Sequence, residues 1–383
     1  MQKKIVLREL TANSRLGSAI YDENNRLLLN KGQILTDQFI NMLLQRGTEE
    51  VFIAESAQIE DLIVEIETWQ EPAKVELDRG LTPPDFRTVH KELATQAERV
   101  EIRSKNSKGF PKEIKDLCKK LVQYTEINSN LDVFVLSQKM GRESLDNHCA
   151  HMINTAVLAT EMGAWLKLDS DSLLDIVLAG YFHDIGKFQL PPELLQKKDK
   201  LTKQEWNVMR THPQLGADIL EKTKWVSQTV VNAVGSHHER MDGVGYPHQS
   251  QASEIPAIAR IIAVAEAYDV LTSDQPYRSA VNPYAAIRKL RDKSFGELDP
   301  KMVQLIFNRV VQHYVGNFVE LSNGQTGHIV FLSPSEPTLP LVQTEDGFVD
   351  LFSHAEIKIV NIYEDEPEKG RGKKKDHHHH HKK

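Results

Sequence analysis

Residues 173–187 read LLDIVLAGYFHDIGK, a long apolar run that ends in polar and charged residues. Residues 173–182 are apolar on nearly every side, which predicts a helix buried in an all-helical core. The helix delivers a polar pair, His183-Asp184, into that interior. Buried ionisable groups are costly unless they are paired or bind a metal. The pair is therefore either a capping or hydrogen-bonded pair or part of a metal site, and these residues alone leave both interpretations open.

Helical periodicity extends on both sides of this stretch, from Lys112 to Tyr314. Breaks within the span fall at glycines, prolines and Asp/Ser clusters. The span is long enough for one domain with its own core, because domains typically take about 100–200 residues. We therefore predict a mainly α protein whose central unit, residues 112–314, is an all-helical domain.

The segments on either side of the central unit have other patterns. Residues 1–57 alternate short strand-like runs with turns and one helix, which predicts a small α/β module with a hairpin over residues 18–29 and a strand at 50–53. Residues 58–111 predict a polar helical connector. Residues 315–363 predict a small β appendage with strands at 318–321 and 328–332. Residues 364–383 have no apolar content to bury, which predicts a disordered tail. Its five histidines are either native or part of an expression tag, so they enter no functional argument.

Composition narrows the range of partners. The chain has 383 residues, and 47 Lys plus Arg against 54 Asp plus Glu give a net charge of −7. This balance offers no general attraction for nucleic acid or for an anionic membrane surface. The two cysteines cannot form a disulfide framework, no stretch reads as an export signal, and none offers the roughly 20 apolar residues of a membrane span. We therefore expect a cytoplasmic protein with no membrane span and no nucleic-acid partner.

Histidines gather around the central stretch. Outside the tail, seven histidines lie between His148 and His248 and only four lie elsewhere. Neighbouring side chains on a helix point about 100° apart, so the adjacent pair His237-His238 cannot easily bind one ion and suits two adjacent metals. The alternative is that His237 and His238 are simply neighbours at the surface or in the core and bind no metal.

Three further candidate ligands lie in helical patterns, namely His151, His212 and Glu266. A set of His, Asp and Glu without thiolate suits iron, manganese, zinc or nickel. Asp184 can bridge two ions with its two carboxylate oxygens. The donor set therefore indicates a site for divalent metal without selecting the metal.

Three motifs follow one another along the central unit: HDIGK at residues 183–187, MRTHP at residues 209–213 and HHERMDGVGYP at residues 237–247. In their order and spacing they resemble the HD-GYP family of bacterial cyclic di-GMP phosphodiesterases, a branch of the HD metal-dependent phosphohydrolases. The resemblance runs from about Lys112 to Tyr314. The N-terminal module also resembles the small module that often precedes this domain in the family.

The resemblance implies roles residue by residue. It implies metal ligation by His151, His183, Asp184, His212, His237, His238 and Glu266. Asp184 and Lys187 become the catalytic residues, with Lys187 against the scissile phosphate; a solvated lysine at a helix end is the alternative. Substrate contacts are implied for Lys187, Asp242, Gly245, Tyr246, Pro247, Tyr277 and Arg278. Residues 242–247, the GYP loop, could also be a purely structural loop, and His148 and His248 are given no role.

The sequence departs from the family's pattern at several positions. The last ligand is usually Asp and is Glu266 here, which places the carboxylate one methylene further out. Asn147 stands where some members have the Glu of a third metal, so we predict two metals rather than three. Gln275 replaces an arginine of the family's substrate segment, and residues 248–252 replace its usual Gly-Leu-x-Gly. These changes put substrate affinity and substrate choice in question.

The implied function is hydrolysis of cyclic di-GMP to linear pGpG, with GMP as a further product left open. Two divalent ions, in the first place iron, with Mn, Ni or Zn also suitable, would share a bridging hydroxide as nucleophile. One alternative is a degenerate signalling module that binds a nucleotide, or a protein partner through the GYP loop or the N-terminal module, without turnover. Another is a phosphohydrolase that acts on a different cyclic dinucleotide.

Overall fold

The computed structural model describes the chain from Asp85 to Glu366, with gaps at 106–108, 145–146, 198, 275–278, 333–335, 355 and 364–365, together with short segments of the first 54 residues. The predicted connector before Asp85 and most of the predicted disordered tail lie outside the described residues. The helices are α3 (Phe86–Lys105), α4 (Glu113–Asn128), α5 (Leu131–Ser144), α6 (Asn147–Trp165), α7 (Ser170–Phe182), α8 (Pro192–Leu195), α9 (Lys203–Met209), α10 (His212–Glu221), α11 (Gln228–Ser236), α12 (Ala257–Thr272), α13 (Pro283–Lys293) and α14 (Pro300–His313).

Helix α7 is the buried helix predicted from residues 173–182, and that prediction is confirmed. The helix begins after its N-cap, Asp169, and every residue from 176 to 182 is buried. At Gly180, an added Cβ would lie 2.7 Å from Cα of Ala156 on α6. Glycine therefore lets the two helices approach closely, which fixes the end of α7 relative to α6.

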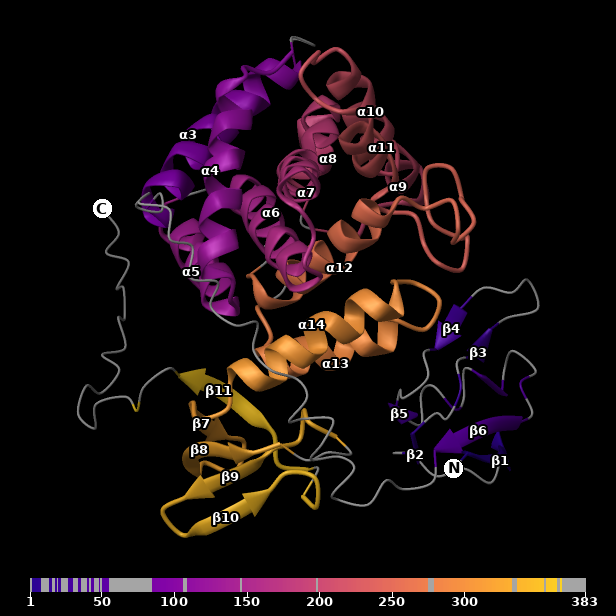
Figure 1. Ribbon diagram of the computed structural model, residues 1–383, viewed down its shortest axis with the longest axis vertical. Coiled ribbons are helices and arrows are strands. Elements are labelled where there is room, and N and C mark those ends of the chain that lie inside the picture. The colour runs from indigo at the N-terminus through magenta and orange to yellow at the C-terminus, as the bar shows by residue number, and fades with distance from the viewer. Residues whose placement is uncertain are drawn as a thin grey trace, which may run out of the picture.

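Helix α3 packs onto the same core, although it lies inside the segment predicted as a connector. Its residues Phe86, Val89 and Leu93 are buried in one cluster with apolar side chains of α6 and α7. The hydroxyl of Tyr181 on α7 donates a hydrogen bond of 2.9 Å to the carbonyl oxygen of Leu93. Figure 1 shows α6 and α7 at the centre of the helical unit, with the other helices around them. The predicted all-helical domain is confirmed.

A C-terminal sheet lies beyond α13 and α14, on the side away from α3 (Figure 1). Its strands are β7 (Phe318–Leu321), β8 (Thr326–Phe331), β9 (Leu341–Thr344), β10 (Gly347–Asp350) and β11 (Ile359–Tyr363), all antiparallel in the order β10-β9-β8-β7-β11. The predicted strands at 318–321 and 328–332 correspond to β7 and β8, whereas the hairpin β9–β10 was not predicted. A buried ion pair of 2.8 Å between Arg291 on α13 and Glu336 joins the helices to this region.

The described N-terminal segments form three antiparallel strand pairs. These are β1 (Gln2–Val6) with β6 (Glu50–Ala54), β2 (Ser14–Arg15) with β5 (Ile34–Leu35), and β3 (Ile20–Tyr21) with β4 (Leu27–Leu29). The hairpin β3–β4 and the strand β6 are both as the sequence predicts. The core of this module consists of Leu7, Leu35, Ile40, Leu43 and Val51, together with Phe295 from the loop after α13.

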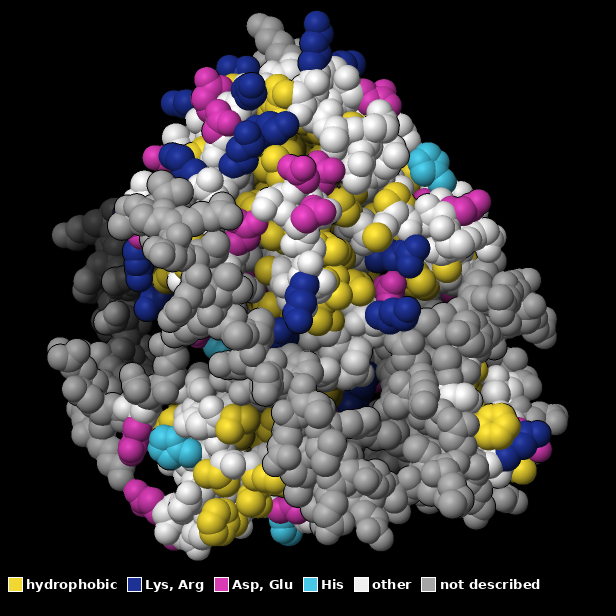
Figure 2. Space-filling view, viewed as in Figure 1, with side chains coloured by type: hydrophobic (Ala, Val, Ile, Leu, Met, Phe, Trp, Pro, Cys, Tyr) yellow, Lys and Arg dark blue, Asp and Glu magenta, His cyan; other side chains and the backbone are white. Residues whose placement is uncertain are grey.

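The face of the molecule drawn in Figure 2 carries charges of both signs. Lys and Arg side chains are interspersed there with Asp and Glu over the helical unit, and hydrophobic side chains are exposed over the C-terminal sheet. Within the described parts of the chain, every helix is too short or too polar to cross a lipid bilayer.

The buried carboxyl of Glu161 on α6 is expected to make the stability of the protein depend on pH. Its fully buried carboxyl accepts hydrogen bonds from Oγ1 of Thr125 (3.1 Å) and Oγ of Ser129 (2.7 Å), and burial raises its pKa to about 8 from a usual 4.5. A raised folded-state pKa means that the stability from this group is complete below about pH 4.5 and is lost as the pH rises to about 8. We expect Glu161→Gln to remove this loss, so that the variant has a melting temperature several degrees above that of the unchanged protein at pH 8 and a similar one at pH 4.5. Thermal unfolding at several pH values measures this, and identical pH profiles for the two proteins would contradict it.

Candidate metal centre

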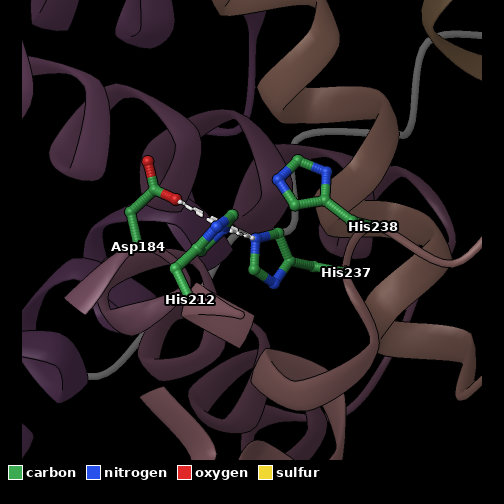
Figure 3. A group of neighbouring side chains, drawn as sticks. All are labelled: Asp184, His212, His237 and His238. Atoms are coloured by element: carbon green, nitrogen blue, oxygen red, sulfur yellow. Dashed lines mark hydrogen bonds and ion pairs between the residues drawn. The ribbon is translucent and has the colours of Figure 1, made fainter. Parts of the chain in front are cut away.

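Five elements bring the seven predicted metal donors together. The donors are His151 on α6, His183 and Asp184 at the end of α7, His212 at the start of α10, His237 and His238 at the end of α11, and Glu266 on α12. Their ligand atoms form two groups, each with all atoms within 4.8 Å of one another: Asp184, His212, His237 and His238 in one, and His151, His183 and Glu266 in the other. Figure 3 shows the first group, in which Asp184, His212 and the adjacent pair His237 and His238 approach one another from three parts of the chain.

Asp184 lies between the two groups. Its Oδ1 is 3.3 Å from Nε2 of His212 and 3.9 Å from Nε2 of His237. Its Oδ2 is 3.4 Å from Nε2 of His183 and 3.9 Å from Nε2 of His151. Each oxygen of this one carboxylate therefore faces a different group of imidazoles.

Three of the histidines share one local arrangement, in which Nδ1 donates a hydrogen bond to the carbonyl oxygen three residues earlier. The pairs are His183 with Gly180 (2.7 Å), His212 with Met209 (2.8 Å) and His237 with Val234 (2.6 Å). A carbonyl oxygen can only accept, so Nδ1 carries the proton. In the neutral ring, Nε2 then presents a lone pair to the site.

These donors fit a divalent cation. The Nε2 atoms of His212 and His237 lie only 3.2 Å apart, so two lone pairs face each other beside the carboxylate of Asp184. Burial, and then the neighbouring His212, lowers the pKa of His237 well below its usual value, which keeps that ring neutral. Against the cost of burial, Lys187 and His183 hold the pKa of Asp184 well below its usual range. Converging lone pairs and an ionised carboxylate are the state that metal binding requires.

Lys187 and Gly186 follow the donor pair on a 3₁₀ helix, η2 (Ile185–Gln189), and not on a continuation of α7. The Nζ atom of Lys187 lies 2.5 Å from Oδ2 of Asp184. A Cβ at Gly186 would lie 2.0 Å from the carbonyl oxygen of His212, so glycine is required for η2 to pass this close to α10. The close approach holds Asp184 and His212 together.

Asp269 is a functional candidate that the sequence reasoning missed. Its Oδ2 accepts a hydrogen bond of 2.7 Å from Nδ1 of His151, which turns Nε2 of that ring toward Asp184. Its Oδ1 accepts bonds from Nε2 of Gln138 (2.9 Å) and Oγ of Ser273 (3.0 Å), and the carboxylate is buried. A carboxylate behind a ligating histidine fixes the orientation of the ring. The available signal was its position three residues after Glu266, on the same side of α12.

The segment after His238 folds back onto the site. The buried carboxylate of Glu239 accepts hydrogen bonds from the backbone N–H groups of His248 (2.6 Å) and Ser250 (3.0 Å). A Cβ at Gly245 would lie 2.3 Å from the backbone nitrogen of Arg240, so this turn requires glycine. Glu239, adjacent to a predicted ligand, is thus the residue that closes the loop.

The predicted substrate residues of the GYP loop have different surroundings. The centre of the Tyr246 ring lies 4.7 Å from the centre of the His238 ring. The guanidinium carbon of Arg210 lies 5.0 Å from the centre of the Tyr246 ring. Pro247 follows Tyr246 through a cis peptide bond. The carboxylate of Asp242 receives two hydrogen bonds from Arg240, of 3.0 and 2.6 Å. Tyr246 therefore faces the donor cluster, whereas Asp242 is engaged within its own loop. The other two predicted contacts, Tyr277 and Arg278, lie outside the described residues.

Comparison with known proteins gives one matching domain family, several similar curated proteins and a similar solved structure. The family model of the HD domain matches residues 132–302, a span that contains all seven donors. The cyclic di-GMP phosphodiesterase PA4108 of Pseudomonas aeruginosa is 36% identical over 180 residues, which cover 47% of this chain and 43% of that protein. The 3'3'-cGAMP-specific phosphodiesterase 2 of Vibrio cholerae is 27% identical over 215 residues, covering 52% of this chain and 41% of that protein. A solved structure, Bd1817, a HDG"Y"P protein from Bdellovibrio bacteriovorus, covers 80% of this chain and 99% of its own at 19% identity, with a TM-score of 0.47.

Residues 132–302 are thus similar to the HD domain. The predicted resemblance to the HD-GYP proteins is confirmed by the similarity to relatives that are named as cyclic di-GMP phosphodiesterases. The chain spans about two fifths of the length of the two curated relatives described above.

Proposed function

We propose that the chain is a metal-dependent phosphodiesterase that opens cyclic di-GMP to linear pGpG at a binuclear centre, with GMP as a further product. The position of Asp184 carries the proposal, because its two oxygens face two separate groups of imidazoles. A bridging carboxylate in a two-metal site needs this arrangement, whereas a site for one ion does not. The names of the relatives support a cyclic dinucleotide as the substrate class.

Each donor group would hold one divalent ion, and the histidine and carboxylate donors suit iron in our proposal, with Mn, Ni or Zn also compatible. Bound there, the ions would supply hydroxide at neutral pH and neutralise phosphate charge. Lys187 would hold a phosphate oxygen with the same ammonium group that now contacts Asp184. Gly245, Tyr246 and Pro247 would form a wall of the substrate site beside His238, with Tyr277 and Arg278 as further contacts. Asp242 would act indirectly, by holding the loop through Arg240.

A substrate panel tests the proposal. Full-length protein, loaded anaerobically with iron or with manganese, is incubated with cyclic di-GMP, with 3'3'-cGAMP and with linear pGpG, and the products are separated by chromatography. We expect about two ions per chain and pGpG as the first product from cyclic di-GMP. Preferred turnover of 3'3'-cGAMP would instead favour the related reaction on a mixed cyclic dinucleotide. A fully loaded protein without turnover of any of them would favour the binding module.

Asp269 gives a prediction about metal affinity alone. We expect Asp269→Asn to weaken Mn²⁺ binding about 10–100-fold, because the amide is a poorer acceptor for Nδ1 of His151 and no longer fixes the ring. Asp274→Asn is a matched control. The carboxylate of Asp274 lies in the same cleft, but it accepts a hydrogen bond from the backbone N–H of Ala280 and not from a predicted metal ligand. Titration calorimetry of the metal-free proteins measures both affinities. Equal affinities for Asp269→Asn and the control would rule out the orienting role.

A further inference from the structure

Phe295 joins the N-terminal module to the helical unit. It lies in the loop between α13 and α14, is only 2% exposed, and packs in one apolar cluster with Leu7, Leu35, Ile40, Leu43 and Val51. Among the described members of that cluster, it alone comes from outside the first 54 residues. Figure 1 shows the α13–α14 loop extending toward the strands of the module. The helical unit therefore supplies one side chain to the core of the module.

The two residues after Phe295 hold the segment that follows the donors His237 and His238. The carbonyl oxygen of Gly296 accepts a hydrogen bond of 2.7 Å from the backbone N–H of Asp242, and that of Glu297 accepts one of 3.0 Å from Met241. The carboxylate of Glu297 also lies 3.5 Å from the guanidinium of Arg240. Residues 240–242 thus have their backbone and one side chain bound to the turn that Phe295 begins.

The turn is internally fixed, so a displacement of Phe295 is passed on to its neighbours. Oγ of Ser294 donates a 2.6 Å hydrogen bond to the carbonyl of Arg291, and the N–H groups of Glu297 and Leu298 both donate to the carbonyl of Lys293. Gly296 has a φ of +82°, a left-handed conformation that favours glycine. A turn with these bonds moves as one piece, which links the module's core to residues 240–242.

The path from this segment to the donors is short. Residues 240–242 follow His238 after a single residue, and the backbone N–H of Tyr246 donates a 3.2 Å hydrogen bond back to the carbonyl of His238. The loop is therefore attached to the donor cluster at one side and to the 294–298 turn at the other.

We infer that Phe295, Gly296 and Glu297 are positioning residues, through which the N-terminal module holds the GYP loop and His238 in their working geometry. The inference rests on the proposed function for its catalytic consequence, but the mechanical link itself does not. A partner or ligand that alters the seating of Phe295 in the module would change the loop at the metal centre. The module then has a defined effect on the site without contributing a ligand to it.

Hydrogen exchange of the full-length protein tests the link without substrate. We expect Phe295→Ala to raise the exchange rates of the Met241 and Asp242 amides at least tenfold, and Leu43→Ala, deep in the module, to raise them in the same direction. Phe318→Ala is the matched control, because it removes a buried phenylalanine from β7 of the C-terminal sheet. In Phe318→Ala, the exchange rates of the Met241 and Asp242 amides should be unchanged.

Metal affinity and turnover extend the test. We expect Phe295→Ala to weaken Mn²⁺ binding about three- to tenfold, and Phe295→Leu, which keeps an apolar side chain in the module, to restore most of the affinity. Unchanged exchange at Met241 and Asp242 in Phe295→Ala, or an equal increase in Phe318→Ala, would overturn the inference. If Phe295→Ala does not fold, Phe295→Leu and Leu43→Ala provide the same comparison. A protein that turns over no cyclic dinucleotide would refute the proposed function and leave the exchange result standing.

Discussion

Asp184→Ala is expected to lower turnover of a cyclic dinucleotide by at least about 10³-fold and to leave the chain with fewer than two bound ions. The reason is that this carboxylate faces both groups of imidazoles, so its removal takes one ligand from each. The melting temperature separates this loss from unfolding, because alanine also removes the carboxylate that the ammonium of Lys187 contacts. Metal content by mass spectrometry, turnover by chromatography and melting temperature measure the three quantities on the same preparation.

Asp175→Ala is the matched control for this change. Asp175 lies on α7, upstream of the same site, and its carboxylate accepts a 2.9 Å hydrogen bond from Oγ of Ser227 and contacts none of the donors. It should keep both metals and full turnover. A variant Asp184→Ala that keeps two ions and normal turnover would refute the bridging role. A variant that loses its metal but still binds the nucleotide would point to a binding module.

Gly186→Ala is expected to have the largest effect on stability, about 3 kcal/mol or more. The added methyl group would lie 2.0 Å from the carbonyl oxygen of His212 and 2.7 Å from the backbone nitrogen of Gly216, so η2 and α10 must move apart. Because Asp184 and His212 lie on these two elements, the movement also separates two donors. Chemical denaturation and metal titration measure the two consequences.

Gly235→Ala on α11 is the control for a glycine near the same site. Its added Cβ would lie 3.4 Å from Cβ of Ala217, which is ordinary contact, and alanine is favoured over glycine in a helix by about 1 kcal/mol. We expect this variant to be as stable as the unchanged protein or more so. Equal stabilities of Gly186→Ala and Gly235→Ala would contradict the close contact between residue 186 and α10.

The fold could be predicted where local pattern and burial agree. The apolar run of residues 173–182 is helical and buried because no face of it is suited to water. Strands β7 and β8 lie on either side of a Ser322-Asn323-Gly324 turn that can be recognised locally. The hairpin β9–β10 was missed because its strands show little alternation of apolar and polar residues and are joined by a polar Glu345-Asp346 connection. The 3₁₀ geometry after Asp184 depends on the neighbouring α10, which no local pattern describes.

The site could be predicted where its residues form motifs. All seven predicted metal donors are brought together by the fold, because each lies in or beside a helix whose place in the bundle follows from its apolar face. Their roles as ligands remain predictions. Asp269, Glu239 and Arg210 were missed, because their importance comes from partners that are distant in sequence or from backbone N–H groups. The link through Phe295 could not be found from sequence either, since an isolated phenylalanine in a loop has no periodicity.

Helices α7 and α11 both end at the donor cluster, where His183 and His237 follow their last residues. The last carbonyl groups of a helix carry a partial negative charge of about half an electron. These two helix ends favour a cation beside Asp184, whose own charge is offset by the ammonium of Lys187 in the metal-free protein. Binding should therefore be ordered: metal enters first, and its charge then raises the affinity for the anionic ligand.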